Sequence, residues 1–159
     1  MIEREAGDEL AGVVDLFGAL TRAELERALD ELAFKRGEAA DRDTVGNAVD
    51  AAVADYYLAA VDREKATLLT PGPVAFPSLP HGAEDLPHIL DIPDREVDQA
   101  ALVETVERRL RADAARAVAA GDADRIERLV DVSYDLETWG ATDVSDVRSR
   151  LDDAVETHN

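Results

Sequence analysis

Apolar residues near the start of the chain recur at intervals of three and four, the spacing of one face of an α-helix. This pattern predicts a first helix over residues 8–19. Thr21 and Glu24 then form a capping-box pattern, because each side chain can accept a hydrogen bond from the other residue's backbone N–H. The apolar positions that follow predict a second helix ending at Gly37, and those of residues 45–56 predict a third.

Beyond Tyr57 the helical spacing is lost. Two short apolar runs, Leu58–Val61 and Ala66–Thr70, flank a polar turn and predict a β-hairpin. The next segment, Thr70–Pro80, contains four prolines, which preclude a regular helix and favour an extended path. Because apolar residues alternate with these prolines, we expect the segment to pack along the domain.

The remainder of the chain returns to helical spacing. Asp98, Asp122 and Asp143 each precede a periodic apolar stretch, the position at which a carboxylate caps a helix. Gly121 and Gly140 follow the first two stretches, as glycine often does at the C-terminus of a helix. The predicted fold class is therefore mainly α with a small β-hairpin.

These elements predict three parts of the chain. Residues 1–80 form a first unit of three helices, a hairpin and the proline-rich segment. Residues 81–94, which contain two further prolines, form an irregular connector. Residues 95–159 form a three-helix C-terminal extension, which we expect to pack with the first unit or to dimerise.

Three helices followed by a hairpin is the element order of a winged helix, and residues 8–70 resemble that fold. The whole chain resembles small acidic haloarchaeal proteins that form an uncharacterised family. This resemblance is carried by Leu20–Gly37, Tyr56–Pro80 and Asp85–Pro93. It implies provenance and fold, and it brings neither a substrate nor a catalytic residue.

Charge supports the same provenance. The chain carries 36 Asp and Glu residues against 17 Lys and Arg residues, a formal net charge of -19. Only Lys35 and Lys65 are lysines. An evenly acidic, lysine-poor surface stays hydrated in molar salt, where a Debye length of about 3 Å screens its self-repulsion. The composition therefore indicates a protein of a halophilic archaeon.

Composition also excludes several classes of site. Cysteine is absent, which excludes disulfides, thiolate catalysis and cysteine-ligated metals. The sequence contains no membrane-length apolar run and no signal-peptide pattern at its start, so we expect a cytoplasmic protein without membrane contact. Nucleophile-elbow, P-loop and dinucleotide fingerprints are missing as well. We assign no catalytic, cofactor-binding or metal-ligating residue.

Two charged regions could contact nucleic acid. In a DNA-binding winged helix, the third helix would enter the major groove. Over residues 41–57, however, this helix has one basic side chain, Arg42, and four aspartates. An arginine cluster extends from Arg108 to Arg128. Several of these arginines follow an acid by four residues, as in the pair Glu107–Arg111. We therefore expect the arginines to form ion pairs with acids of their own helix on a solvated surface.

One stretch has the residue types of a metal site. His81, Glu84, Asp85 and His88 form an H-x-x-E-D-x-x-H pattern, and imidazole and carboxylate ligands suit zinc or manganese. The spacing differs from the helical H-E-x-x-H motif, and proline-bounded loops leave the ligand directions unspecified. The alternative interpretation is a histidine pair in a polar loop.

The leading hypothesis is a non-enzymatic interaction or regulatory module whose partner is another protein or a second copy of the chain. Apolar helix and hairpin surfaces would dock to that partner, because salting-out ions strengthen hydrophobic association. A winged-helix DNA-binding regulator is the first alternative. A metal-dependent hydrolase that uses His81 and His88 is the second.

Overall fold

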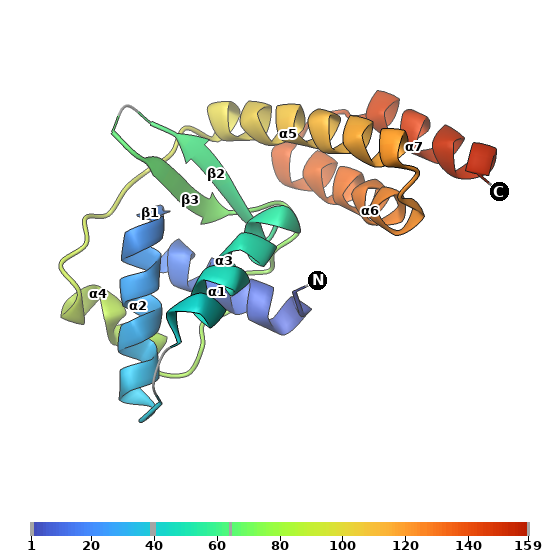
Figure 1. Ribbon diagram of the computed structural model, residues 1–159. Coiled ribbons are helices and arrows are strands. Elements are labelled where there is room, and N and C mark those ends of the chain that lie inside the picture. Colours follow the sequence, from blue (N-terminus) through green and yellow to red (C-terminus); the bar gives the residue numbers. More distant parts are fainter. Residues whose placement is uncertain (1, 39–40, 64, 159) are drawn as a thin grey trace. The chain divides into compact units, whose positions relative to one another are not determined.

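The structure is a computed structural model that describes residues 2–38, 41–63 and 65–158 (Figure 1). It confirms a mainly α fold with a small antiparallel sheet. In chain order, the elements within the described residues are α1 (Arg4–Phe17), β1 (Leu20–Thr21), α2 (Arg22–Lys35), α3 (Arg42–Ala54), β2 (Leu58–Asp62), β3 (Thr67–Pro71), the 3-10 helix η1 (Ala83–Asp85), α4 (Leu86–Ile89), α5 (Gln99–Ala120), α6 (Ala123–Gly140) and α7 (Ser145–His158).

The chain divides into two compact units, residues 1–97 and residues 98–159. The boundary therefore lies between Val97 and Asp98, directly before α5. Residues 81–94 contain the short helical turns η1 and α4 and are part of the first unit.

The first helices follow from local signals in the sequence. In α1, apolar residues at helical spacing face the core, and Val13 and Val14 are completely buried. The helix begins at Arg4, earlier than predicted, and ends at Phe17; its C-cap residue, Gly18, has a φ of 86° that only glycine readily adopts. The capping box is confirmed at the start of α2: the Glu24 N–H donates to Thr21 Oγ1, and the Thr21 N–H donates to Glu24 Oε1 at 2.9 Å.

The sheet of the first unit has three strands, in the order β1-β3-β2, and all pairs are antiparallel. The predicted hairpin is confirmed as β2 and β3. The sequence analysis missed β1, which consists of two residues between α1 and α2. Leu69 in the central strand lies opposite Leu20 of β1 and opposite Ala60 of β2, so β1 extends the hairpin through β3.

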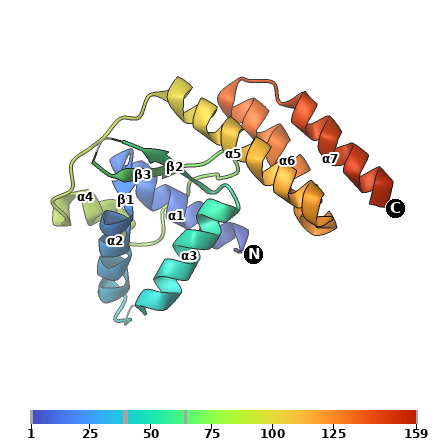
Figure 2. The ribbon, with the colours of Figure 1, turned by 45° about the horizontal axis from the view of Figure 1, so that its top comes forward.

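A proline-rich strap, residues 72–97, runs around the helices of the first unit. Over α1, the backbone N–H of Ser78 donates to the carbonyl oxygen of Asp8 at 3.0 Å. At the end of α2, Lys35 and Arg36 donate to strap carbonyl groups. The views in Figures 1 and 2 both place α4 beside α2. Residues 70–80 therefore pack along the domain as expected at Ser78 and at the buried Val74 and Pro80, whereas Phe76 and Leu79 are exposed.

The far end of the strap is fixed at the start of α2. The guanidinium group of Arg95 donates to both carboxylate oxygens of Glu24, at 2.5 and 3.0 Å, and to the carbonyl oxygen of Ala19. The hydrogen bond from Arg95 lowers the pKa of the Glu24 carboxyl group, despite partial burial. Glu24 therefore closes the helix cap and also anchors the strap.

The second unit is a bundle of α5, α6 and α7, in which α6 packs against both neighbours (Figure 2). Each helix buries one apolar face: Leu110 of α5, Leu129 of α6 and Leu151 of α7 are completely buried. Asp122 caps α6 by accepting from the Arg125 N–H at 3.1 Å, as predicted. Asp98 stands at the N-cap position of α5 without a side-chain capping bond.

Across both units, none of the helices in the described residues is long and apolar enough to cross a lipid bilayer.

Candidate functional site

A pocket opens between α1, α2 and α3 of the first unit. Its volume is about 430 Å³, within the range of about 300–1,000 Å³ that is typical of ligand-binding clefts. The apolar lining residues are Ala6, Leu10, Leu29, Leu32, Ala33, Val45, Ala48 and Pro80, and the polar ones are Glu9, Arg36, Glu38 and Thr44. The walls are therefore mainly apolar, and the pocket is our candidate site.

Helical spacing and small side chains together create the pocket. Residues 29, 32 and 33 lie on one face of α2, Arg36 is its C-cap residue, and Val45 and Ala48 lie one turn apart on α3. Alanines at positions 33 and 48 leave space that larger side chains would fill. The helices consequently approach each other without closing the gap between them.

The pocket has a buried floor and a partly exposed wall. Leu10 and Leu32 are buried, and Pro80 of the strap is buried with them. Leu29, Val45 and Ala48 are only partly buried. All three belong to the apolar positions whose periodicity predicted the second and third helices. The structure shows that this face continues beyond the core into an open apolar surface.

Charged side chains surround the opening. Among the residues that line it, Glu9 and Glu38 are acidic and Arg36 is basic. The Arg36 guanidinium donates to the carbonyl oxygen of His81 at 3.1 Å, which ties it to the strap. The Thr44 hydroxyl donates to the Asp41 carboxylate at 2.9 Å. The rim thus has excess negative charge, and the Thr44 proton is already engaged.

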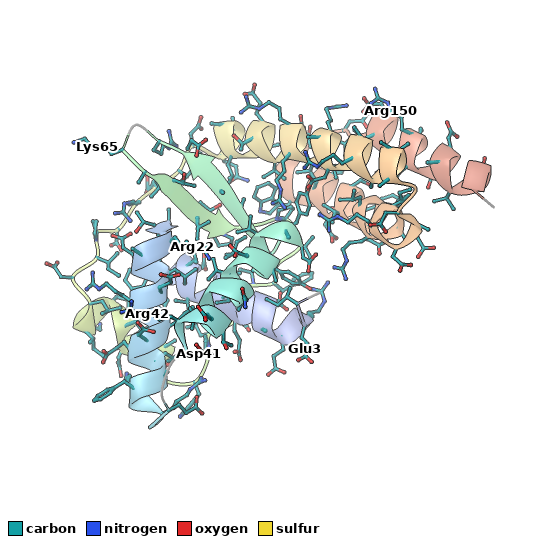
Figure 3. All side chains as sticks on the ribbon, viewed as in Figure 1. Glu3, Arg22, Asp41, Arg42, Lys65 and Arg150 are labelled. Atoms are coloured by element: carbon teal, nitrogen blue, oxygen red, sulfur yellow. The ribbon has the colours of Figure 1, made fainter. Side chains whose placement is uncertain are left out.

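The exposed face of α3 is also acidic. Arg22 of α2 reaches toward it and donates to Asp50 Oδ1 at 2.7 Å and to the carbonyl oxygen of Gly46 at 3.0 Å (Figure 3). The hydrogen bond with Asp50 raises the pKa of Arg22. Arg42 is exposed beside Asp41 and Asp43. Such a face does not favour phosphate contacts, which depend on an excess of cations.

The structure does not assemble His81, Glu84, Asp85 and His88, the residues of the alternative metal-site hypothesis, into a cluster. The Asp85 carboxylate lies 3.7 Å from Lys35 Nζ, and the carbonyl group of His81 accepts from Arg36. Glu84 and His88 are exposed. Within residues 2–38, 41–63 and 65–158, no group of three or more His, Asp or Glu side chains is arranged to hold a metal ion.

Several arginines of the second unit are paired with acids, although Arg111 has another partner than expected. Arg109, Arg116 and Arg125 all lie within ion-pair distance of Asp113, whose side chain is only 10% exposed. Arg111 pairs with Asp146 of α7 at 2.7 Å rather than with Glu107 of its own helix. The hydrogen bond from Arg111 lowers the pKa of Asp146. The contacts of Arg125 with Asp113 and of Arg111 with Asp146 join different helices of the bundle, whereas Arg109 and Arg116 pair with Asp113 inside α5.

The turn of the β-hairpin carries two cations. Arg63 follows β2 and Lys65 precedes β3, and both are exposed. Figure 3 shows Lys65 at the end of the hairpin, where it extends away from the ribbon. This is the small basic feature that a nucleic-acid contact through the hairpin would use.

Comparison with protein families identifies the family of the chain. A model of a family of unknown function, DUF7109, matches residues 8–156. The chain belongs to this family. Neither a curated protein nor a solved structure matches it significantly. The DUF7109 match extends over both units, and the description of the family names no activity.

Proposed function

We propose that this member of DUF7109 is a non-enzymatic protein-interaction or regulatory module that binds a partner protein through the pocket of its first unit. The observation that carries the proposal is the apolar lining of the 430 Å³ opening, whose wall residues Leu29, Val45 and Ala48 are partly exposed to solvent. Apolar surface of this kind gains free energy when a partner removes it from water.

The composition supports a halophilic archaeal origin and a cytoplasmic location for this module. Its 36 acids and two lysines suit molar salt, where exposed ion pairs are screened. Under those conditions hydrophobic association is strengthened by salting-out ions. An apolar pocket is therefore the type of docking site that keeps its affinity in such a cell.

The first unit is, in this proposal, a winged helix. The order α1-β1-α2-α3-β2-β3 and the sheet order β1-β3-β2 support this assignment, with the β2–β3 hairpin as the wing. In a DNA-reading winged helix, α3 would occupy the major groove. Here its acidic surface supports a scaffold that contacts protein instead.

DNA binding is the alternative function, and one observation favours it. Arg63 and Lys65 give the hairpin an exposed basic tip, which could contact the phosphate backbone while α3 stays away from the groove. This alternative makes a different prediction from the pocket hypothesis, because it requires the hairpin cations and does not require the pocket.

The test is a pull-down from a haloarchaeal lysate in molar KCl, with the tagged full chain as bait and with or without nuclease. Two variants separate the hypotheses. Ala48→Trp fills the pocket, and the matched control Ala23→Trp places the same side chain on an exposed position of α2 that does not line the pocket. Circular dichroism confirms that both variants fold.

The proposal expects a stoichiometric protein that survives nuclease, is lost with Ala48→Trp and is kept with Ala23→Trp. Retained DNA that is lost when Arg63 and Lys65 are changed to serine would instead support the regulator. A partner that binds the wild type and Ala48→Trp equally would refute docking at the pocket.

A further inference from the structure

We propose that the occupant of the pocket is a cationic amphipathic helix of the partner protein, with large apolar side chains on one face and arginine or lysine beside them. This inference rests on the proposed function and adds the chemistry of the partner. It follows from three features of the pocket: its lining, its position between helices and the charge of its rim.

The lining requires apolar anchors. Eight of the twelve residues around the opening are apolar, and the floor at Leu10, Leu32 and Pro80 is buried. A polar side chain inserted here would lose its hydration without gaining partners, because the polar groups lie at the rim. Leucine, isoleucine, methionine or phenylalanine side chains would instead transfer apolar area from water into contact with these walls.

The position of the pocket suits a helix. Its walls come from one face each of α1, α2 and α3, and the lining residues on these helices lie at helical spacing. Amphipathic helices bind such grooves by inserting side chains at positions i, i+3 or i+4, and i+7. The partly exposed row of Leu29, Val45 and Ala48 provides the complementary surface.

The charge of the rim selects cations. Glu9 and Glu38 line the opening. Asp41, at the N-cap of α3, and Asp43, in its first turn, are exposed. Against these four acids stand Arg36 and Arg42. The Arg36 guanidinium is already bonded to the carbonyl oxygen of His81. An acidic helix would meet repulsion here, whereas flanking arginines or lysines would meet carboxylates at contact distance.

The same charges argue against a small anionic ligand. Arg36 is the one cation in the described lining of the pocket, and it is shared with the strap. The Thr44 hydroxyl, which could otherwise donate to an anion, donates to Asp41. A carboxylate or phosphate group would therefore enter a site whose nearest charged neighbours include Glu9 and Glu38.

The test uses a displayed library of random peptides of about 15 residues, enough for four helical turns. The library is selected on the full chain in molar KCl and counter-selected on the Ala48→Trp variant. Enriched peptides are then synthesised, and their dissociation constants are measured over a range of KCl concentrations. The measurements compare the wild type with the double variant Glu9→Arg/Glu38→Arg. The charge-matched control is Asp15→Arg/Asp30→Arg, whose two positions are exposed and lie outside the pocket lining.

The proposal expects enriched sequences with apolar residues at helical spacing and an excess of arginine and lysine. The Glu9→Arg/Glu38→Arg variant should weaken their binding about five- to tenfold at the lowest salt, the effect of two partly exposed ion pairs, and the control should not. The difference should shrink as KCl rises, because salt screens the pairs.

Two other results would overturn the inference, and they have different meanings. Enriched peptides that are apolar but acidic or uncharged, with affinities that ignore both double variants, would leave the pocket as a docking site and refute its preference for cations. If every peptide that binds the wild type is removed by the counter-selection on Ala48→Trp, docking at the pocket is refuted altogether, and the proposed function with it.

Discussion

The two units bury their apolar helix faces to different extents. In the second unit each of α5, α6 and α7 packs against the other two, and ion pairs link the helices at their edges. Arg148 of α7, for example, donates to Glu137 and Ser133 of α6 and lies over the Tyr134 ring. In the first unit α1, α2 and α3 are held by the sheet and the strap, and an apolar opening remains between them.

In the proposed function, this difference assigns partner binding to the first unit. A bundle whose apolar faces are mutually covered needs no partner to be stable. An open apolar wall contributes less to stability than it would if covered, and the proposed partner would provide that cover. Leu129 of α6 is completely buried, whereas Leu29 of α2 is only partly buried. The contrast between these two leucines provides the first test.

Truncation of the two leucines should have unequal effects. Leu129→Ala removes a completely buried side chain and should lower the free energy of unfolding of the second unit by about 3 kcal/mol. Leu29→Ala, at the pocket wall, should lower that of the first unit by about 1 kcal/mol, because part of its area is already in water. Urea unfolding in molar KCl measures both. Equal losses would show that the pocket is closed in solution, which contradicts the comparison.

The strap should be sensitive to a single methyl group. A Cβ atom at Gly12 of α1 would lie 2.0 Å from the carbonyl oxygen of Ser78, so Gly12→Ala must displace the strap. We expect a loss of about 2 kcal/mol in the unfolding free energy of the first unit. Gly37→Ala is the control: its φ of 72° strains alanine by about 1 kcal/mol, but no atom lies within 4 Å of the added methyl.

Proteolysis distinguishes strap displacement from general destabilisation. Limited digestion should cut residues 72–97 faster in Gly12→Ala than in Gly37→Ala, at conditions where both variants remain folded. If the two variants are cut at the same rate, the strap is not held by its crossing of α1.

Features with local causes were predictable from the sequence. The capping box at Thr21 and Glu24 involves residues three apart, so its hydrogen bonds can be inferred without knowledge of the fold. The β2–β3 hairpin likewise follows from two apolar runs and the turn between them.

Features with tertiary causes were not predictable. β1 is two residues long and exists because Leu20 lies opposite Leu69, a pairing that no local pattern indicates. The pocket depends on what stands opposite Val45 and Ala48. Their periodicity is the same whether a neighbouring side chain covers them or leaves them open. The alanines at 33 and 48 were the available signal, and only the packing shows that they border empty space.

The second unit should depend on Asp113 more than on its exposed ion pairs. Asp113→Asn removes the carboxylate that Arg109, Arg116 and Arg125 share, and it leaves three neighbouring cations without that partner. Because the Asp113 side chain is largely buried, we expect the unfolding free energy to fall by about 1–2 kcal/mol. Asp146→Asn breaks a single exposed pair with Arg111 and should have a smaller effect. A larger loss for Asp146→Asn in urea unfolding would contradict this ranking.

The smallest expected effect concerns the anchor of the strap, and it depends on pH. The hydrogen bond from Arg95 lowers the pKa of Glu24 in the folded protein below its ordinary value. A depressed carboxyl pKa stabilises the fold above the unfolded-state pKa, and this stabilisation is lost as the pH falls through the folded pKa. Glu24→Gln should therefore lower the unfolding free energy of the first unit by about 1 kcal/mol at neutral pH. The difference from the wild type should shrink as the pH falls through the lowered pKa of Glu24, because both side chains are then uncharged.

Urea unfolding of the two proteins at a series of pH values measures this difference directly. The contributions of the other carboxylates cancel because both proteins contain them. A difference that stays constant down to the most acidic pH would mean that the Arg95–Glu24 ion pair does not anchor the strap, and that the cap hydrogen bonds of Thr21 alone explain the role of Glu24.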